Sequence, residues 1–502
     1  MQETHHQKHH HVLNGSRMLY EVSVRPWFLT LSQKYKKTID RINEIPMEEF
    51  QHIKNMGFDM VWLMGVWSLG KYAVQYETTA EHLKQEFSHV LPGYTKDDVI
   101  GYPYAITKYE VNPQVGTLQD LQHLKKSLNN MGLHLMLDFV PNHTAVDSPL
   151  VNSNPDHYVR APKDTKAPYD PNTYLPSGIA CGASIWGHSW LDTAQINIWN
   201  TQAIRATIQE LSSVAAVSDA VRVNMAHLVL NSLFNKKWGT QLASWGYKQP
   251  AHEFWDVAIK EVKKSHPHVV FMAEVYTGYE EELQNLGFDY TYDKSFRDIV
   301  GGGNIDQIRG WINSHSWKYN KQSVRFISNH DEQRGVAYFG SWWRSNAAAL
   351  LTYTLPGMKM FWMGEFEGMR NQLEVHLRRQ LPEPVNEATV QFYKVLTSVI
   401  SKPAFKAGDF QMLTVTGTDS SWPLIAYKWT HQQDRVLCVV NFSNVTGSGR
   451  IILNDAEPHQ GRDIVPVSEL LTGVTYQRSA HEMKSEGLFV IVNSWSGQIF
   501  KY

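Results

Sequence analysis

The feature that most constrains the fold is an arrangement that occurs twice in the first third of the chain. The stretches "IKNMGFDMVWLM" (53–64) and "LNNMGLHLMLDF" (128–139) each join a helix-like segment, through Asn-Met-Gly, to a strongly apolar run. A glycine in the left-handed conformation closes many helices, and an apolar run directly after it is typical of a buried strand. Both stretches therefore predict a helix followed by a parallel strand.

Six further apolar segments continue this alternation and are separated by helical patterns. With the two stretches above they make eight predicted strands, and they lie at 19–27, 219–225, 268–276, 287–293, 324–331 and 358–365. Eight strands alternating with helices are the count and order of an α/β fold of the (β/α)8 TIM-barrel type. We predict this barrel for residues 19–143 and 195–402.

Three segments depart from the alternation. Residues 144–194 are rich in Pro, Asn, Asp, Ser and Gly and are too long for an ordinary loop, so they predict an inserted domain after the third strand. Residues 403–502 contain short strands with turn residues between them, which predict a C-terminal antiparallel β-sandwich. Residues 1–18 are polar and rich in histidine, and we interpret them as a tail or tag that holds no metal.

Composition and charge narrow the classes of partner. The formal net charge of −2 gives no electrostatic reason to expect nucleic acid or an anionic membrane, and no apolar run is long enough for a membrane span. The two cysteines, Cys181 and Cys438, together with the lack of an apolar signal-peptide core, favour a cytoplasmic protein. The charged run "EVHLRRQ" (374–380) is interpreted as a solvated helix face. Oligomeric state stays open.

Polar residues end four of the predicted strands. Asp138, Glu274 and Asp331 each close an apolar segment, and Arg222 and Asn224 share one side of the strand in "SDAVRVNMAH". The C-terminal ends of barrel strands meet at one face, so these residues are expected to become neighbours. Clustered carboxylates repel and desolvate one another, which makes a catalytic or binding role more plausible than a purely structural one.

Several of these segments resemble the motifs of the α-amylase superfamily of retaining α-glycoside hydrolases and transglycosylases. "DFVPNH" is similar to its D-x-x-x-N-H motif, "AVRVN" to G-F-R-x-D, "MAEVY" to its strand-five acid motif and "ISNHDE" to N-H-D, while "TAQIN" is a weaker match to a further motif. They stand at 138–143, 220–224, 272–276, 327–332 and 193–197. The order matches, the spacing leaves room for the family's domain B after strand three, and the resemblance runs from about Leu19 to Tyr502.

The resemblance implies a role for each matching position. Asn224 takes the place of the catalytic nucleophile, Glu274 that of the general acid/base and Asp331 that of the transition-state stabiliser. The remaining implied roles are sugar binding for Arg222, His143, His330 and Tyr102 or Tyr104, a neighbouring sugar subsite or a supporting position for His227, and structural support for Asp138 and Asn142. A retaining mechanism needs one carboxylate that attacks and a second, roughly 5 Å away, that protonates the departing oxygen.

Asn224 departs from the family at the most demanding position. A neutral amide neither attacks the anomeric carbon efficiently nor stabilises positive charge on it, so the chain as written is expected to be nearly inactive. We favour an Asp-to-Asn replacement in a retaining α-glycosidase or α-glucanotransferase for maltooligosaccharides or small α-glucosides. The alternative is a natural pseudoenzyme that binds carbohydrate or serves as an interaction scaffold.

No cofactor is expected to be required and no metal ligand is assigned. The resemblance brings in Ca²⁺, because many relatives bind it through the asparagine of the N-H motif, here Asn142, and carboxylates of domain B. The insert carries few acids. The chain shows neither a glycine-rich phosphate loop nor zinc-ligand spacing, which argues against nucleotide and metallohydrolase chemistry.

Overall fold

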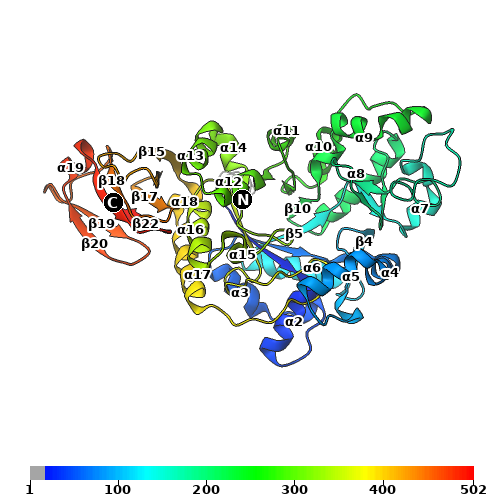
Figure 1. The fold of residues 1–502 in the computed structure, drawn as a ribbon, viewed down its shortest axis with the longest axis horizontal. Helices are drawn as coiled ribbons and strands as arrows, with labels where there is room; N and C mark the ends of the chain where they lie inside the picture. The colour runs from blue at the N-terminus through cyan, green and yellow to red at the C-terminus, as the bar shows by residue number, and fades with distance from the viewer. Residues whose placement is uncertain (1–16) are drawn as a thin grey trace, which may run out of the picture.

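A computed structural model describes residues 17–502, so all but the last two residues of the predicted tail lie outside the described part. The molecule is elongated (Figure 1), with a barrel in the middle and the C-terminal β domain, coloured orange to red, at one end. The opposite end carries the segment around α7 (Pro149–Ser153). Within residues 17–502, no helix combines the length and apolarity that a membrane crossing needs.

Eight parallel strands close into a barrel, which confirms the predicted fold class. Each strand pairs with the next along the chain, and the last pairs with the first. In this order they are β1 (Met18–Ser23), β2 (Met60–Met64), β5 (His134–Phe139), β10 (Ala220–Val223), β11 (Val270–Ala273), β12 (Tyr290–Tyr292), β13 (Ser323–Arg325) and β14 (Met358–Trp362). Nearly all of their residues are buried because helices cover the outside of the barrel and side chains fill its interior.

The two Asn-Met-Gly segments adopt the conformation that their sequence predicts. Helix α3 (Met47–Asn55) is followed by Gly57 at φ +100°, and α6 (Leu118–Asn130) is followed by Gly132 at φ +84°. Both angles lie in the region that favours glycine, and each turn leads the chain directly into a buried barrel strand.

The larger helices of the barrel wall follow its strands in sequence. They are α2 (Val24–Tyr35), α8 (Thr201–Ala216), α9 (Asn231–Ser244), α10 (Phe254–Ser265), α12 (Lys294–Gly302), α13 (Ile305–Ser314), α16 (Trp342–Tyr353) and α17 (Glu387–Ile400). Their apolar faces join one core cluster with the barrel strands. Trp62 and Trp255 are among the largest fully buried side chains in it.

Two excursions rise from the barrel on the side that carries the predicted site. In the first, β6 (His143–Ala145) pairs with β9 (Thr193–Gln195), and the chain between them forms α7 and the short hairpin of β7 (Gly182–Ala183) and β8 (Ser189–Trp190). The second lies between β2 and α6, and sequence reasoning missed it. It contains β3 (Trp67–Leu69), α4 (Lys71–Thr79), α5 (Glu81–Val90) and β4 (Ile106–Val111).

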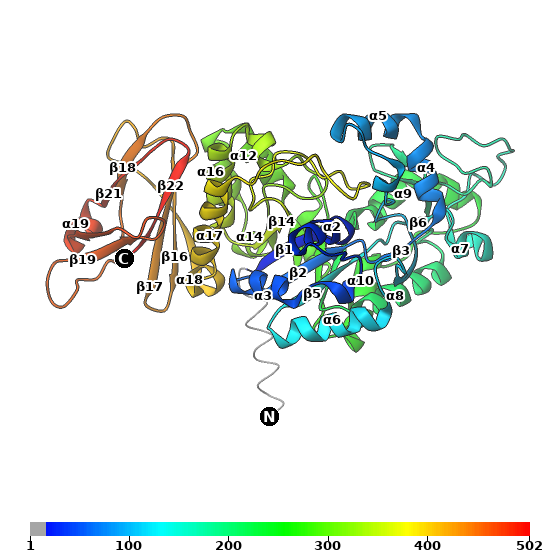
Figure 2. The same ribbon diagram turned by 90° about the horizontal axis from the view of Figure 1, so that it is seen from below.

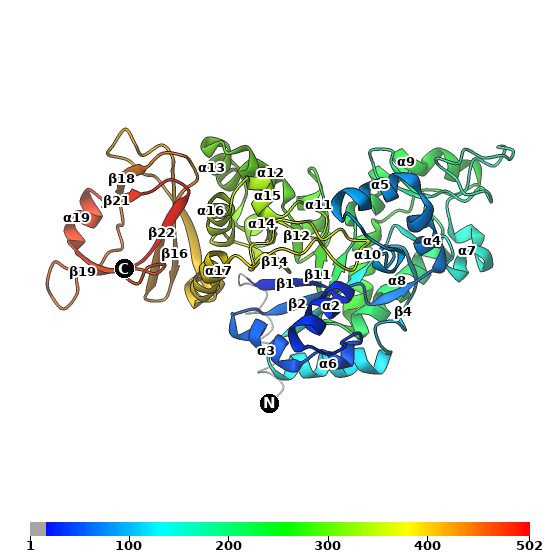
Figure 3. The ribbon, with the colours of Figure 1, turned by 60° about the horizontal axis from the view of Figure 1, so that its bottom comes forward.

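The two excursions lie side by side. Figures 2 and 3 both show α4 near α7, and Figure 2 also shows β6 beside them. The contact is a hydrogen bond in which the backbone N–H of Tyr72, in the first turn of α4, donates to Asp147 Oδ2 at 3.1 Å. Together the excursions build a wall above one edge of the barrel mouth.

The C-terminal domain consists of two antiparallel sheets. The larger has the order β15 (Asp409–Leu413), β16 (Leu424–His431), β17 (Asp434–Asn441), β22 (Ser496–Lys501), β19 (Val465–Glu469) and β20 (Thr475–Arg478), and the smaller pairs β18 (Gly447–Ile451) with β21 (Leu488–Val492). Apolar side chains from both sheets form a second core. The domain is anchored to the barrel wall where Trp429 Nε1 donates to the Thr354 carbonyl at 2.8 Å.

Candidate active site

The predicted site residues converge at the C-terminal mouth of the barrel. Strand pairing aligns Arg222 with Asp138 and Val223 with Ala273, so Asn224 and Glu274 leave adjacent strands at matching positions. Asp331 reaches the same mouth from the loop that follows β13. Residues almost 200 positions apart are brought together because parallel strands all end on this face.

Arg222 is the buried cation of the site. Its guanidinium lies 3.5 Å from Asp138 Oδ1 and 3.3 Å from Glu274 Oε1, and none of its side chain is exposed. Its Cζ atom also lies over the rings of Trp62 and Tyr104, at 4.8 and 5.0 Å from the ring centroids. Burial works against the charge, but the surrounding carboxylates and phenols outweigh it and raise the pKa of Arg222. The guanidinium therefore orients both acids and supplies a fixed positive charge.

Asp138 contacts Arg222 and the indole of Trp62. It accepts a hydrogen bond from Trp62 Nε1 at 2.9 Å, and burial raises its pKa to about 6. The Asp138 carboxylate thus contacts Arg222 and the Trp62 indole, as a residue in the structural role that the family resemblance implies would do.

Glu274 is held by two donors in addition to Arg222. The backbone N–H of Met225 donates to Oε1 at 2.9 Å, and the Tyr276 hydroxyl donates to Oε2 at 2.6 Å. Met225 reaches this position only by adopting φ +43°, a left-handed conformation that is unfavourable for a residue with a side chain. Strand pairing places Asn224 next to Glu274 at the mouth, where the backbone N–H of Asn224 donates to the Phe139 carbonyl at 2.9 Å.

A buried histidine links two carboxylates across the barrel. His330 Nδ1 lies 2.5 Å from Glu21 Oε1, on β1, and Nε2 lies 3.1 Å from Asp331 Oδ2. Glu21 and His330 are fully buried, whereas the Asp331 side chain is 35% exposed and faces the cavity. Burial opposes a charged ring, but the two carboxylates outweigh it and raise the pKa of His330 to about 10. The imidazolium in turn holds the pKa of Asp331 below its ordinary value, against the effect of burial.

Replacing Glu21 by glutamine is expected to reduce the pH dependence of stability. A raised His330 pKa stabilises the fold fully below the ordinary value near 6.5, and this contribution is lost as pH rises toward about 10. Without the Glu21 charge, the pKa of His330 should be raised less, so the pH range over which this stabilisation is lost becomes narrower. The free energy of unfolding should therefore fall less steeply between these values. Urea unfolding at several pH values measures the slope, and NMR titration of the ring measures the pKa.

Glu469→Gln is the matched control for Glu21→Gln. Glu469 is also buried, but it accepts its hydrogen bonds from the backbone N–H groups of Leu471, Thr472 and Ile499. Its replacement should lower stability at every pH without changing the slope. A slope in Glu21→Gln equal to that of the unmodified protein would contradict the coupling.

Among the remaining tyrosine and histidine site residues predicted from sequence, Tyr102 lines the cavity and the others are buried. Tyr104 is buried and stacks on His330 with ring centroids 5.5 Å apart, whereas Tyr102 is half-buried and lines the cavity. His143 Nε2 lies 3.1 Å from the Tyr104 carbonyl, and burial lowers its pKa to about 4. His227 is buried against Tyr279, with ring centroids 5.8 Å apart, and does not line the cavity.

Both oxygens of Asn142, the residue that the resemblance links to calcium, already accept a hydrogen bond. The side-chain amide of Gln195 donates to Asn142 Oδ1 at 3.1 Å and to the Asn142 carbonyl at 2.9 Å, so an N–H group already lies against both oxygens that a cation would need. Within residues 17–502, no three His, Cys, Asp or Glu side chains are grouped as metal ligands.

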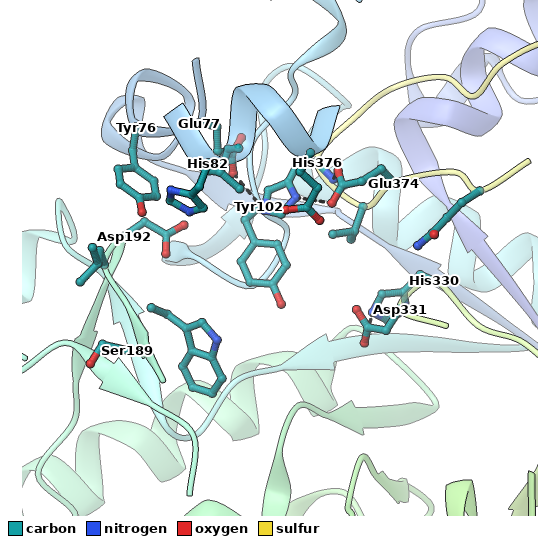
Figure 4. A pocket seen from close by; sticks show the side chains of 16 residues that line it. Tyr76, Glu77, His82, Tyr102, Ser189, Asp192, His330, Asp331, Glu374 and His376 are labelled. Atoms are coloured by element: carbon teal, nitrogen blue, oxygen red, sulfur yellow. Dashed lines mark hydrogen bonds and ion pairs between the residues drawn. The ribbon is translucent and has the colours of Figure 1, made fainter. Parts of the chain in front are cut away.

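A cavity of about 330 Å³ opens above Asp331 (Figure 4). Several residues that line it were missed by sequence reasoning: Glu77 and His82 from the second excursion, Asp192, and Glu374 and His376 from the loop after β14. The interpretation of residues 374–380 as a solvated helix face is wrong, because the segment is an irregular loop whose Glu374 is buried. Charge pattern alone does not distinguish a solvated face from a polar cavity wall.

Comparisons with known proteins agree with this geometry. The model of the α-amylase catalytic domain matches residues 46–406, and the chain therefore belongs to the α-amylase family. A similar curated protein, α-amylase MalA of Haloarcula japonica, is 21% identical over 437 residues, which cover 85% of this chain and 55% of that protein. The chain thus spans about half the length of this relative.

Solved structures of the family share the fold. The maltogenic α-amylase AmyB from Thermotoga neapolitana superimposes with a TM-score of 0.68 at 20% identity, over 98% of this chain and 99% of that one. The α-amylase from Geobacillus thermoleovorans complexed with acarbose gives a TM-score of 0.67 at 16% identity, over 98% of each chain.

Proposed function

We propose that the chain binds maltooligosaccharides or small α-glucosides at the barrel mouth, using the site of a retaining α-glycosidase or α-glucanotransferase from which the nucleophilic carboxylate is missing. The observation that carries the proposal is the set of ion-paired side chains at the barrel mouth that carries Asn224. Arg222, Glu274 and the Asp331–His330 pair keep the residue types and contacts that sugar chemistry needs.

Each group has a defined task in this proposal. Glu274 stands where an acid protonates the departing glycosidic oxygen, and Asp331 faces the cavity with a charged carboxylate that accepts hydrogen bonds from sugar hydroxyls. Asn224 offers an amide of nearly the same shape as aspartate but no negative charge, so a bound α-glucoside stays intact. Hydrolysis and transfer share the first half-reaction and differ in whether water or a sugar hydroxyl completes it.

The proposal requires no cofactor, which is supported by the Gln195 amide that lies against both Asn142 oxygens. It also places the protein in the cytoplasm. Cys181 and Cys438 are both free and buried, which fits a reducing compartment.

Isothermal titration calorimetry with maltose, maltotriose and maltopentaose tests the binding. We expect saturable binding of the α-linked sugars, because the buried charges of the site are already oriented in the free protein. Cellobiose is the control, since its β-linkage presents the second ring at a different angle. A folded protein that shows no heat with any α-linked sugar would instead support the scaffold alternative.

A further inference from the structure

The chain turns sharply just after the predicted acid, Glu274. Thr277 adopts φ +51° and Gly278 φ +94°, so two consecutive residues occupy the left-handed region. This conformation is unfavourable for a β-branched residue such as threonine. The backbone N–H of Gly278 donates to Glu280 Oε2 at 2.9 Å. A strained turn is thus maintained directly after Tyr276, a residue to which the family resemblance assigns no role.

The side chain of Tyr276 is half-buried and points back to Glu274. Its hydroxyl donates to Glu274 Oε2 at 2.6 Å. The edge of the His227 ring packs against the Tyr276 ring, with centroids 6.1 Å apart and an interplanar angle of 88°. Burial and the neighbouring carboxylates of Glu274 and Asp331 raise the pKa of Tyr276 well above its ordinary value. The hydroxyl therefore keeps its proton at any pH at which the fold is used.

The two carboxylate oxygens of Glu274 have different surroundings. Oε1 lies 3.3 Å from the Arg222 guanidinium and accepts the backbone N–H of Met225 at 2.9 Å, so a proton on Oε1 would meet a cation and a second donor. The partner of Oε2 is the Tyr276 hydroxyl, which can donate to a charged carboxylate and accept from a protonated one. The acid proton therefore belongs on Oε2, where Tyr276 can hold the oxygen in both protonation states.

We propose that Tyr276 is a positioning residue that keeps the proton-carrying oxygen of Glu274 in place through both halves of a retaining reaction. The inference rests on the proposed function, which gives Glu274 the role of the acid. With a carboxylate at position 224 to bond to the anomeric carbon, the bond to the glycosidic oxygen breaks and that oxygen takes the proton from Oε2. In the second half, Oε2 takes a proton from the water or sugar hydroxyl that displaces this carboxylate. Tyr276 keeps its own proton throughout and acts only through Glu274.

Tyr276→Phe removes the hydroxyl and keeps the ring, and Tyr279→Phe, in the same loop, is the matched control. In the unmodified protein, ¹³C NMR follows the titration of the Glu274 carboxyl, which is assigned by its absence in Glu274→Gln. Tyr276→Phe should move this titration by about one pH unit toward higher pH, because the charged carboxylate loses a donor. Tyr279→Phe should leave it in place. The other charged and titratable groups around the pair are the same in both variants: Arg222, Asp138, Asp331, His227, Tyr102 and Tyr292.

Reaction rates in an Asn224→Asp background separate an effect on the acid from a general loss of structure. Tyr276→Phe should lower kcat for maltotriose about tenfold or more and leave KM unchanged, because Oε2 is no longer held toward the glycosidic oxygen. Fluoride is a leaving group that needs little protonation, so single-turnover release from α-maltosyl fluoride should keep its rate. Tyr279→Phe should change neither rate.

The outcomes distinguish the two proposals. If Asn224→Asp is active and Tyr276→Phe changes neither its kcat nor the Glu274 titration, the positioning role is wrong and the proposed function stands. If Tyr276→Phe slows maltotriose and α-maltosyl fluoride equally, Tyr276 supports the fold or the sugar and the inference is also wrong. If Asn224→Asp is inert, the proposed function fails, and the titration alone decides whether Tyr276 holds Glu274: an unchanged titration overturns the inference.

Discussion

Asn224→Asp is expected to switch on cleavage or transfer of α-glucosidic bonds, with a rate increase of about three orders of magnitude or more. An aspartate at this position would stand beside Glu274, where the adjacent strand ends provide the carboxylate pair of a retaining mechanism. Such an increase corresponds to a barrier lowered by roughly 4 kcal/mol. Release of product from maltotriose measures the rate, and NMR of the first product shows whether the anomeric configuration is retained.

Two variants control this experiment. Asn224→Ala should remain as inactive as the unmodified protein, because it supplies no carboxylate. Adding Glu274→Gln to Asn224→Asp should abolish most of the new activity, since the leaving oxygen then lacks its acid. A folded Asn224→Asp protein that stays inert on a broad panel of α-glucosides would contradict the proposal that only the nucleophile is missing.

Arg222→Met is expected to cause the largest loss of stability among single changes at the site, about 3–5 kcal/mol. Removing the guanidinium leaves Asp138 and Glu274 buried without the cation that both contact. Sugar binding should be lost as well, because the orientation of Glu274 depends on the same group. Urea unfolding at neutral pH measures the stability, and calorimetry with maltotriose measures the binding.

Lys260→Met provides the comparison with an exposed ion pair. Lys260 lies 2.9 Å from Asp256 on α10, and its side chain is 74% exposed, so its loss should cost less than about 1 kcal/mol. Adding Asp138→Asn to Arg222→Met should recover part of the lost stability, because it removes one of the two unpaired charges. An Arg222→Met protein as stable as Lys260→Met would show that the buried cation does not hold the site together.

The barrel and the mouth that carries the candidate active site could be predicted from the sequence, because both depend on local sequence patterns. Glycines at 57 and 132 mark helix ends through backbone conformation alone, and the apolar runs after them identify buried strands. Once eight strands are recognised, the geometry of a barrel brings Arg222, Asn224 and Glu274 to one mouth. Sequence reasoning missed the excursion between β2 and α6 because its short helices lie between two barrel strands. They leave the pattern of apolar strands unchanged.

By itself, the sequence determined the class of fold and the residue types that meet at the barrel mouth. It also predicted where the inserted and C-terminal segments lie. These follow from periodicity and chain order, which each segment carries within itself. Only the tertiary structure decided that Glu21 pairs with His330 across the barrel and that Glu77 is buried beside His376. Burial and ion pairing depend on segments about 300 residues apart, and a carboxyl in a helical pattern has the same local sequence whether water or a cavity surrounds it.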